Sequence, residues 1–172
     1  MPKVYLVLLS IYLSGFQVSA KSSLNAEDSI PDAPLIHRAQ LDSLLSLNDD
    51  TTRIINFWAT WCRPCVAELP TFFEMENTIK NQSVKFIYVS LDFKRELTGA
   101  LRKFIQTRHL HNTILLLDEP DYNAWIDKVH PSWSGALPAT VFMRNSEKQY
   151  RFAEKDFTFA ELDSVIKTLL PR

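Results

Sequence analysis

The sequence predicts an α/β domain in which helices pack on a central β-sheet, and three observations support this fold class. Short runs of β-branched and aromatic residues alternate along the chain with segments whose apolar residues recur at helical spacing. The 172 residues are 46% hydrophobic and 23% charged, a composition typical of one globular domain with a full core. The formal net charge is −1 and no basic face is apparent, which argues against nucleic acid as a partner.

The first half of the predicted domain contains two helices and two strands. Residues 39–47 carry leucines along one stripe of a short amphipathic helix. Residues 52–58 include the Ile-Ile and Phe-Trp pairs typical of a buried strand. Residues 62–80 favour a helix that contains Pro70, where we expect a kink. The apolar run 84–91 predicts an interior strand of a parallel sheet.

The second half is expected to complete the sheet and cover it. The order of the patterns predicts a layered domain with right-handed crossovers between parallel strands. We expect a helix over 94–108, a short strand over 113–117, a short helix over 122–129, a loop over 130–136, a strand over 140–144, its partner around 149–152, and a helix over 158–170.

Residues 1–20 have the pattern of a secretory signal. Lys3 is the only charged residue in this segment, residues 4–16 are largely apolar, and small residues precede Lys21. The apolar run is shorter than the roughly 20 residues that span a bilayer, and an uncleaved, slightly short anchor is the alternative. We therefore predict a leader or tether over 21–36 and one domain over 37–172, exported to a compartment where disulfides persist.

The only two cysteines, Cys62 and Cys65, lie where the predicted strand 52–58 leads into the predicted helix. Backbone N–H groups at a helix N-terminus favour an anion, so the first thiol is pushed toward the thiolate that attacks disulfides. Pro64 is tolerated in that first turn because its missing N–H would have no helical partner there. The arrangement predicts a reversible dithiol/disulfide couple.

Other uses of two cysteines compete with this interpretation. A structural disulfide closing a four-residue loop would contribute only about 2 kcal/mol in the chain-entropy model. A structural zinc site needs four ligands, and the chain has no second cysteine pair. We predict no metal site, although a Cu(I) site formed by both thiols and one histidine stays open. The histidines, His37, His109, His111 and His130, show no ligand spacing with the thiols.

Two segments carry a resemblance to a known family. The stretch Asn56-Phe57-Trp58-Ala59-Thr60-Trp61-Cys62-Arg63-Pro64-Cys65, with Glu68 and Pro70, resembles the TlpA-like branch of the thioredoxin superfamily. The stretch Gly135-Ala136-Leu137-Pro138-Ala139-Thr140 looks like the cis-proline segment of that family. The resemblance implies a thioredoxin-like fold: a central mixed β-sheet flanked by helices, with a TlpA-type insertion between the cysteine helix and the cis-proline strand.

The resemblance also implies a role for each residue of the centre. Cys62 would be the exposed nucleophile that forms a mixed disulfide, and Cys65 would resolve it. Glu68 lies three residues after Cys65, on the same helical face, and would exchange the proton of Cys65 with a pKa raised by burial. Asn56 stands where cytoplasmic thioredoxins carry a buried aspartate, which leaves the acid–base duty to Glu68. The alternative is an ordinary first-turn glutamate that favours the helix dipole.

Substrate binding is expected on both sides of the thiols. A cis peptide bond at Pro138 would leave the backbone of Leu137 free to pair with an extended substrate; a trans-proline beginning an edge strand is the alternative. Trp61 would offer an apolar surface to partners, next to Arg63 and Pro64. The family more often has Pro, Gly or Glu at the position of Arg63. A guanidinium there would stabilise the thiolate and make the couple more oxidising, unless it is simply solvated. Trp133 would either line the same groove or pack in the core.

The resemblance implies an exported, periplasmic thiol–disulfide oxidoreductase of the cytochrome c maturation type. Its expected partners are disulfide-containing exported proteins and a membrane thiol donor of electrons, and the expected state is a monomer. A disulfide-forming oxidant and a copper-binding or redox-sensing protein are the alternatives. A peroxide-reducing enzyme is disfavoured because a Pro-x-x-x-Thr-x-x-Cys context is absent around Cys62. No organic cofactor is expected, since the three glycines form no phosphate-binding motif.

Overall fold

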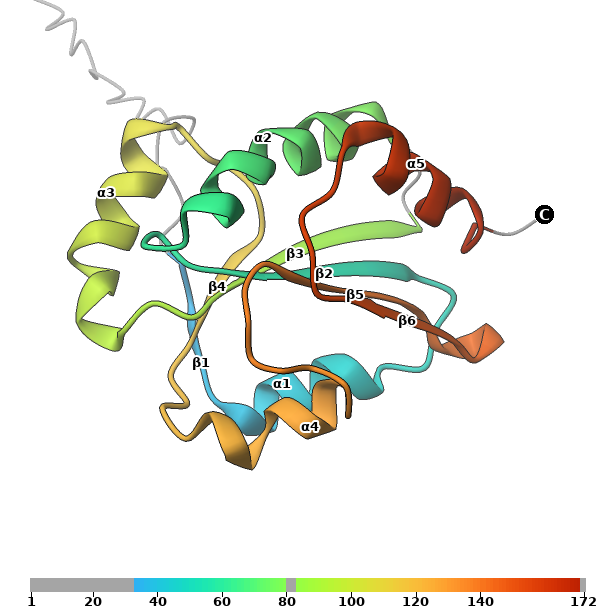
Figure 1. The fold of residues 1–172 in the computed structure, drawn as a ribbon, viewed down its shortest axis with the longest axis horizontal. Coiled ribbons are helices and arrows are strands. Elements are labelled where there is room, and N and C mark those ends of the chain that lie inside the picture. Colours follow the sequence, from blue (N-terminus) through green and yellow to red (C-terminus); the bar gives the residue numbers. More distant parts are fainter. Residues whose placement is uncertain (1–32, 80–82, 171–172) are drawn as a thin grey trace, which may run out of the picture.

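A computed structural model describes residues 33–79 and 83–170 as an α/β domain (Figure 1). The predicted signal segment lies outside these residues. The strands are β1 (Leu35–Ile36), β2 (Thr52–Trp58), β3 (Val84–Ser90), β4 (Ile114–Leu117), β5 (Ala139–Arg144) and β6 (Gln149–Ala153). The α-helices are α1 (Arg38–Ser46), α2 (Arg63–Thr78), α3 (Ala100–Thr107), α4 (Ile126–Val129) and α5 (Phe159–Lys167); three 3₁₀ turns are η1 (Lys94–Leu97), η2 (Tyr122–Ala124) and η3 (Asn145–Glu147).

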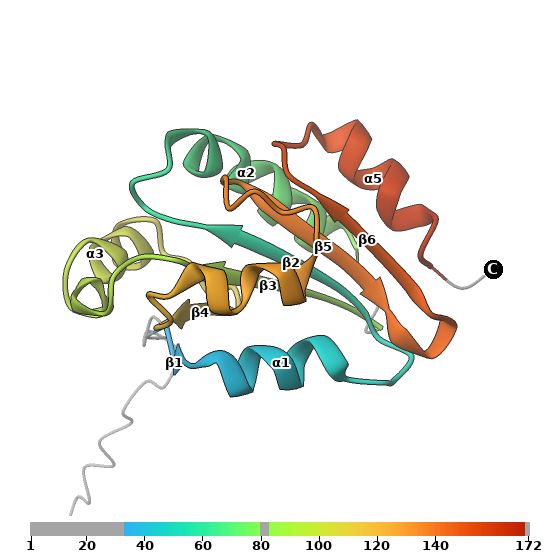
Figure 2. The ribbon, with the colours of Figure 1, turned by 60° about the horizontal axis from the view of Figure 1, so that its bottom comes forward.

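The strands form one mixed six-stranded sheet in the order β1-β4-β3-β2-β5-β6. The first four strands of that order run parallel, β5 is antiparallel to β2, and β6 is antiparallel to β5. Helices α2 and α5 lie on one side of the sheet, and α1 and α4 lie on the other (Figures 1 and 2). All seven residues of β2 are buried, as expected for a central strand covered on both faces.

Alternate residues of β2 point into two separate cores. Ile54 and Trp58 belong to the cluster under α2, α3 and α5, whereas Ile55 and Phe57 belong to the cluster that packs against α1 and α4. Asn56 has the parity of the α2 face and is completely buried among these apolar residues. A polar side chain buried among apolar residues needs hydrogen-bond partners from the neighbouring elements.

Most predicted elements are confirmed, with differences of a few residues at their ends, and two predicted helices are divided. The segment predicted as one helix over 94–108 is the turn η1 followed by α3. Gly99 between them has a ψ of −123°, outside the helical region, and the Glu96 carboxylate accepts the N–H of Ala100 at 2.8 Å. This hydrogen bond satisfies an N–H at the start of α3 that has no partner within the helix. The Glu96 side chain therefore caps α3, which begins as a separate helix at this point.

The second divided helix is the one predicted over 122–129, which is η2 followed by α4. Trp125 separates the two, with a φ of −138°, and it is 1% exposed. Its ring packs against Phe57 and Trp133. Burial of this large ring therefore fixes a backbone conformation that a continuous helix would not allow.

The predicted tether also differs from the structure at its end. Leu35–Ile36, assigned to the tether over 21–36, forms β1 and pairs with β4 at the edge of the sheet. The sheet therefore begins two residues before the domain boundary expected from the sequence. In the described ranges, no helix has the length and apolar character needed to cross a membrane.

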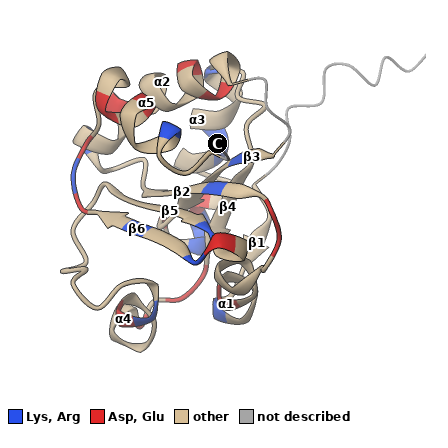
Figure 3. Ribbon diagram, turned by 90° about the vertical axis from the view of Figure 1, so that its right-hand side faces the viewer, with Lys and Arg blue, Asp and Glu red and all other residues tan. Residues whose placement is uncertain are grey.

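Charges are distributed over the whole domain rather than gathered in one place. In the view of Figure 3, acidic and basic positions are interspersed along the helices, strands and connecting segments. This distribution agrees with the net charge near zero and offers no extended basic surface in that view.

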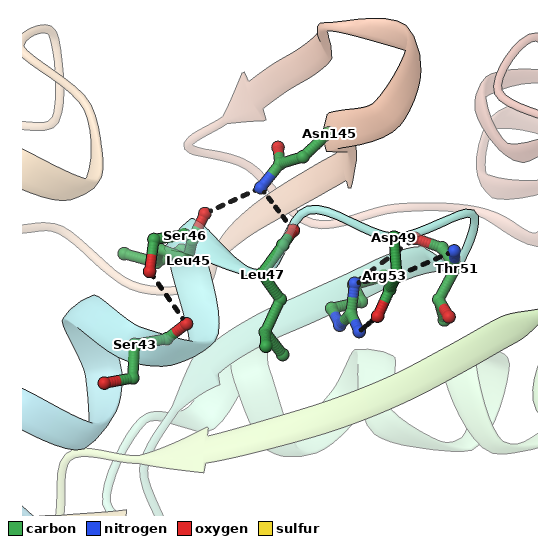
Figure 4. Close-up of polar contacts among 8 residues, drawn as sticks. All are labelled: Ser43, Leu45, Ser46, Leu47, Asp49, Thr51, Arg53 and Asn145. Atoms are coloured by element: carbon green, nitrogen blue, oxygen red, sulfur yellow. Dashed lines mark hydrogen bonds and ion pairs between the residues drawn. The ribbon is translucent and has the colours of Figure 1, made fainter.

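Polar contacts tie together the end of the sheet where β2 begins and β5 ends (Figure 4). The Asn145 amide donates to the carbonyls of Leu45 and Leu47 at 2.9 and 2.8 Å, where α1 ends. Arg53 donates to both carboxylate oxygens of Asp49 at 2.8 and 2.7 Å. Because the cysteines follow the opposite end of β2, these contacts hold the scaffold without taking part in the thiol chemistry.

Candidate active site

The two cysteines lie at the start of α2, directly after the central strand. Cys62 is the N-cap residue: its backbone is extended, its N–H donates to the carbonyl of Ala59 at 3.1 Å, and α2 begins at Arg63. The Cys62 sulfur accepts the N–H of Cys65 at 3.3 Å, which is the bond that a capping oxygen usually makes. The two sulfurs form a disulfide with 5.3 Å between the Cα atoms. Reduction would leave the Cys62 thiolate at the positive end of the helix.

The two sulfur-bearing residues differ in accessibility. Cys62 is 6% exposed and Cys65 is completely buried, so a partner would reach Cys62 first. Trp61, at 61% exposed, is the most prominent apolar side chain beside them. Arg63 and Pro64 are exposed as well. Arg63 forms no ion pair with any residue that the structure describes, which favours the solvated alternative for this guanidinium.

Glu68 lies inside the domain, below the cysteines on α2. It is 4% exposed, and α2 has no acidic residue in its first turn. Its carboxylate accepts the Asn56 amide at 2.9 Å and the backbone N–H of Phe157 at 3.0 Å. The alternative of an ordinary first-turn glutamate is therefore wrong, because this side chain points into the core rather than along the helix end.

Burial raises the pKa of Glu68 from 4.5 to about 7. Desolvation of the carboxylate is the main cause, the nearby charge of Asp156 adds to it, and the hydrogen bonds from Asn56 and Phe157 oppose it. A carboxyl with a pKa near neutrality can both accept and return a proton at physiological pH. Cys65 lies three residues earlier on the same helix, so the two side chains share one face.

The network continues to the strand that follows the cis-proline. The Asn56 amide nitrogen also donates to the Thr140 hydroxyl at 3.0 Å, whereas the Asn56 oxygen is buried without a partner in the described part of the chain. Sequence reasoning identified Asn56 and Glu68 but not Thr140 or the N–H of Phe157. Thr140 follows Pro138 by two residues, which was the one local signal that could have marked it.

The Leu137–Pro138 peptide bond is cis, as predicted, and β5 begins at the next residue. Trp133, the other aromatic candidate near this segment, is a core residue: it is 4% exposed and packs against Phe57 and Phe152. Its indole N–H donates to the carbonyl of Ala136 at 2.9 Å. Trp133 thus supports the loop before Pro138 from below rather than lining the surface.

An open hollow of about 340 Å³ joins the cysteine side of the site to the cis-proline side. Trp61 and Leu137 lie on its wall together with Tyr122 and Ile126, which belong to η2 and α4. Sequence reasoning assigned residues 122–129 to a short helix and missed their place beside the site. Nothing in the local sequence of residues 122–129, a partly apolar segment between two predicted strands, indicated that they lie beside the site.

Within residues 33–79 and 83–170, no group of three or more His, Cys, Asp and Glu side chains is placed to hold a metal ion. His37 bonds to the carbonyl of Asp118, and the ring of His130 stacks on Phe152. These two histidines therefore have structural contacts of their own.

Comparison with known proteins identifies the family of this chain. A model of the AhpC/TSA family matches residues 28–148, a segment that includes both cysteines and the cis-proline. The chain belongs to the AhpC/TSA family.

Two relatives of this AhpC/TSA chain are about a quarter identical to it over the matched segments. Sporulation thiol-disulfide oxidoreductase A of Bacillus subtilis is 26% identical over 113 residues, which cover 66% of this chain and 67% of that protein. Thiol-disulfide oxidoreductase ResA of Oceanobacillus iheyensis is 27% identical over 119 residues, 69% of this chain and 57% of that protein. The match thus spans about two thirds of the length of the first relative and less than two thirds of the length of ResA.

A solved structure supports the fold. The thioredoxin-related protein from Neisseria meningitidis serogroup B superposes with a TM-score of 0.62 at 23% identity, covering 73% of this chain and 89% of that one. The thioredoxin-like fold expected from the resemblance is therefore confirmed. In this AhpC/TSA chain the segment between α2 and the cis-proline contains α3, β4 and α4, and β4 lies between β1 and β3 in the sheet.

Proposed function

We propose that this protein is an exported thiol–disulfide oxidoreductase that reduces disulfides in other exported proteins. The observation that carries the proposal is the asymmetry of the two sulfurs. Cys62 caps α2 and is the more accessible, whereas Cys65 is completely buried on the same helical face as Glu68, whose pKa is about 7. The relatives named as thiol-disulfide oxidoreductases support the same class of reaction. The sequence pattern of residues 1–20 supports export.

The reaction proceeds in two exchanges. The Cys62 thiolate attacks one sulfur of a substrate disulfide, a mixed disulfide forms, and the other substrate sulfur leaves as a thiolate. Cys65 then loses its proton to Glu68 and attacks the Cys62 sulfur, which releases the second substrate sulfur. The substrate gains two electrons, and the enzyme is left with the Cys62–Cys65 disulfide. A membrane thiol donor would return the enzyme to the dithiol form.

The reduction potential of the Cys62–Cys65 couple tests the proposal directly. We expect a value near or below about −250 mV in glutathione or dithiothreitol buffers, as for thioredoxin-like reductants. A value of about −120 to −180 mV would indicate a disulfide-forming oxidant instead. The absence of a reversible couple, with Cu(I) retained through purification, would favour the copper-binding alternative and overturn the enzyme.

The hollow beside Trp61 should distinguish protein substrates from small ones. Replacing Tyr122, which is 40% exposed in its wall, with alanine is expected to raise KM for a protein disulfide about tenfold, because apolar contact with the substrate is lost. Turnover of a small aromatic disulfide should not change. Phe159→Ala is the matched control, since Phe159 is 36% exposed on α5 and is absent from the hollow. Equal losses with both substrates would contradict a binding role.

A further inference from the structure

A buried carboxylate outside the reaction described above contacts the turn that carries Cys62. Asp92 follows β3 and is 3% exposed. It accepts the backbone N–H of Thr60 at 3.0 Å and the Thr60 hydroxyl at 2.6 Å, and it accepts the hydroxyl of Ser90 at 2.7 Å. Since β2 and β3 are parallel neighbours, the segments after their carboxyl ends meet at the same edge of the sheet.

Thr60, which Asp92 contacts, belongs to the tight turn that leads into Cys62. Thr60 lies two residues before Cys62, and the N–H of Cys62 donates to the carbonyl of Ala59 at 3.1 Å. The carbonyl of Trp58 accepts the N–H of Leu91 at 2.8 Å, which fixes the two strand ends together. Asp92 therefore fixes the backbone of the turn from one side, while α2 fixes it from the other.

The carboxylate of Asp92 is held by hydrogen-bond donors rather than by a counter-ion. Among the residues that the structure describes, no lysine, arginine or histidine forms an ion pair with Asp92. The oxygen–oxygen distances of 2.6 and 2.7 Å are those of charge-assisted hydrogen bonds. Burying a charge without a counter-ion is costly. A neutral side chain could form hydrogen bonds to the same turn. The negative charge of Asp92 is therefore not needed to hold the turn, and we look for its role in the thiol chemistry.

We propose that Asp92 is a positioning residue for the thiol centre, which holds the turn before Cys62 and whose negative charge keeps the Cys62–Cys65 couple reducing. This inference rests on the proposed function. A negative charge behind the turn disfavours the Cys62 thiolate, which is the charged product of reduction, and therefore favours the disulfide. Arg63, the exposed residue directly after Cys62 in the sequence, carries the opposite charge.

Asp92→Asn tests the charge with little change of shape. With its oxygen at the position of Asp92 Oδ2, the asparagine still accepts the N–H of Thr60 and the hydroxyl of Ser90, and its amide can donate to the Thr60 hydroxyl oxygen. We expect the equilibrium with glutathione to move about tenfold toward the dithiol, which corresponds to a potential about 30 mV less negative. Alkylation of Cys62 in the reduced protein below neutral pH should become faster, because more of it is thiolate. Asp92→Ala removes the contacts as well and should also lower thermal stability.

Asp118→Asn is the matched control. Asp118 lines the same hollow as Asp92 but pairs with Lys94 at 3.3 Å, and in the described part of the chain its carboxylate forms no hydrogen bond with the turn before Cys62. Its substitution should leave the potential unchanged. An unchanged potential in a folded Asp92→Asn variant, or an equal shift in both variants, would overturn the role of Asp92. If the wild-type protein itself forms no reversible couple, the proposed function fails, and that result is separate from any difference between the variants.

Discussion

A Cys65→Ser variant is expected to stop after half a reaction and to accumulate as a mixed disulfide between Cys62 and its substrate. Cys62 keeps its position as N-cap of α2, so the first exchange should proceed. Without the buried Cys65 sulfur the intermediate has no internal thiol to resolve it. Multiple-turnover reduction of a protein disulfide should fall to the uncatalysed background, and a covalent complex should be visible on a non-reducing gel and by mass spectrometry.

Cys62→Ser is the control for this experiment. That variant retains a thiol only at Cys65, which is completely buried, so it should lose turnover without trapping substrate. Trapping by Cys62→Ser but not by Cys65→Ser would reverse the assigned roles. Equal trapping by both variants would show that burial does not separate the two sulfurs.

Glu68→Gln is expected to slow resolution of the mixed disulfide about 10²-fold above neutral pH, the usual scale for loss of a general base. In the wild-type protein the rate of resolution should rise with pH to an inflection near 7, because the pKa of Glu68 is about 7 and the ionised form accepts the Cys65 proton. The variant should lack that inflection. Stopped-flow fluorescence from pH 5 to 9 would measure it.

The same substitution should change how stability depends on pH. Because the folded state raises the pKa of Glu68 from 4.5 to about 7, the folded protein holds this proton more tightly than the unfolded chain. The stabilisation is fully present below about pH 4.5 and is lost as the pH rises to about 7. The wild-type protein should therefore lose about 2 kcal/mol relative to Glu68→Gln over that window, allowing for partial solvent screening.

Chemical denaturation of the disulfide form at several pH values measures this difference. Glu74→Gln is the matched control, because Glu74 lies on the same helix but is exposed. The two substitutions should differ in their effect on the pH slope. A wild-type slope that matches that of Glu68→Gln would contradict the raised pKa.

The sequence predicted the elements that depend on local pattern. The central strand 52–58 has the expected bounds, because its Ile-Ile and Phe-Trp pairs place β-branched and aromatic residues on both faces, as in a buried strand. The start of α2 was predictable because the cysteines, Pro64 and the preceding strand all point to the same helix N-terminus. The cis-proline was predicted from the resemblance of its neighbours, since periodicity alone does not distinguish cis from trans.

What the sequence did not reveal depends on contacts between distant segments. The partners of Glu68 and Asn56 include the N–H of Phe157, 89 residues from Glu68, and the hydroxyl of Thr140, 84 residues from Asn56. Asp92 contacts Thr60 across 32 residues. The division of the predicted helix 94–108 was missed for a different reason: its apolar stripe is continuous, and the break depends on a carboxylate cap from Glu96.

The carboxyl of Glu68 is shared by three separate parts of the chain: it projects from α2, receives the amide of Asn56 in β2, and receives the N–H of Phe157 just before α5. Its acidity is therefore adjustable from positions that never touch a substrate. Natural variation or engineering at Asn56, Thr140 or the segment before α5 could shift the pH range over which the enzyme works while the surface around Trp61 stays the same. The pKa of the proton-transfer group and the specificity for protein substrates can therefore change independently of each other as such proteins evolve.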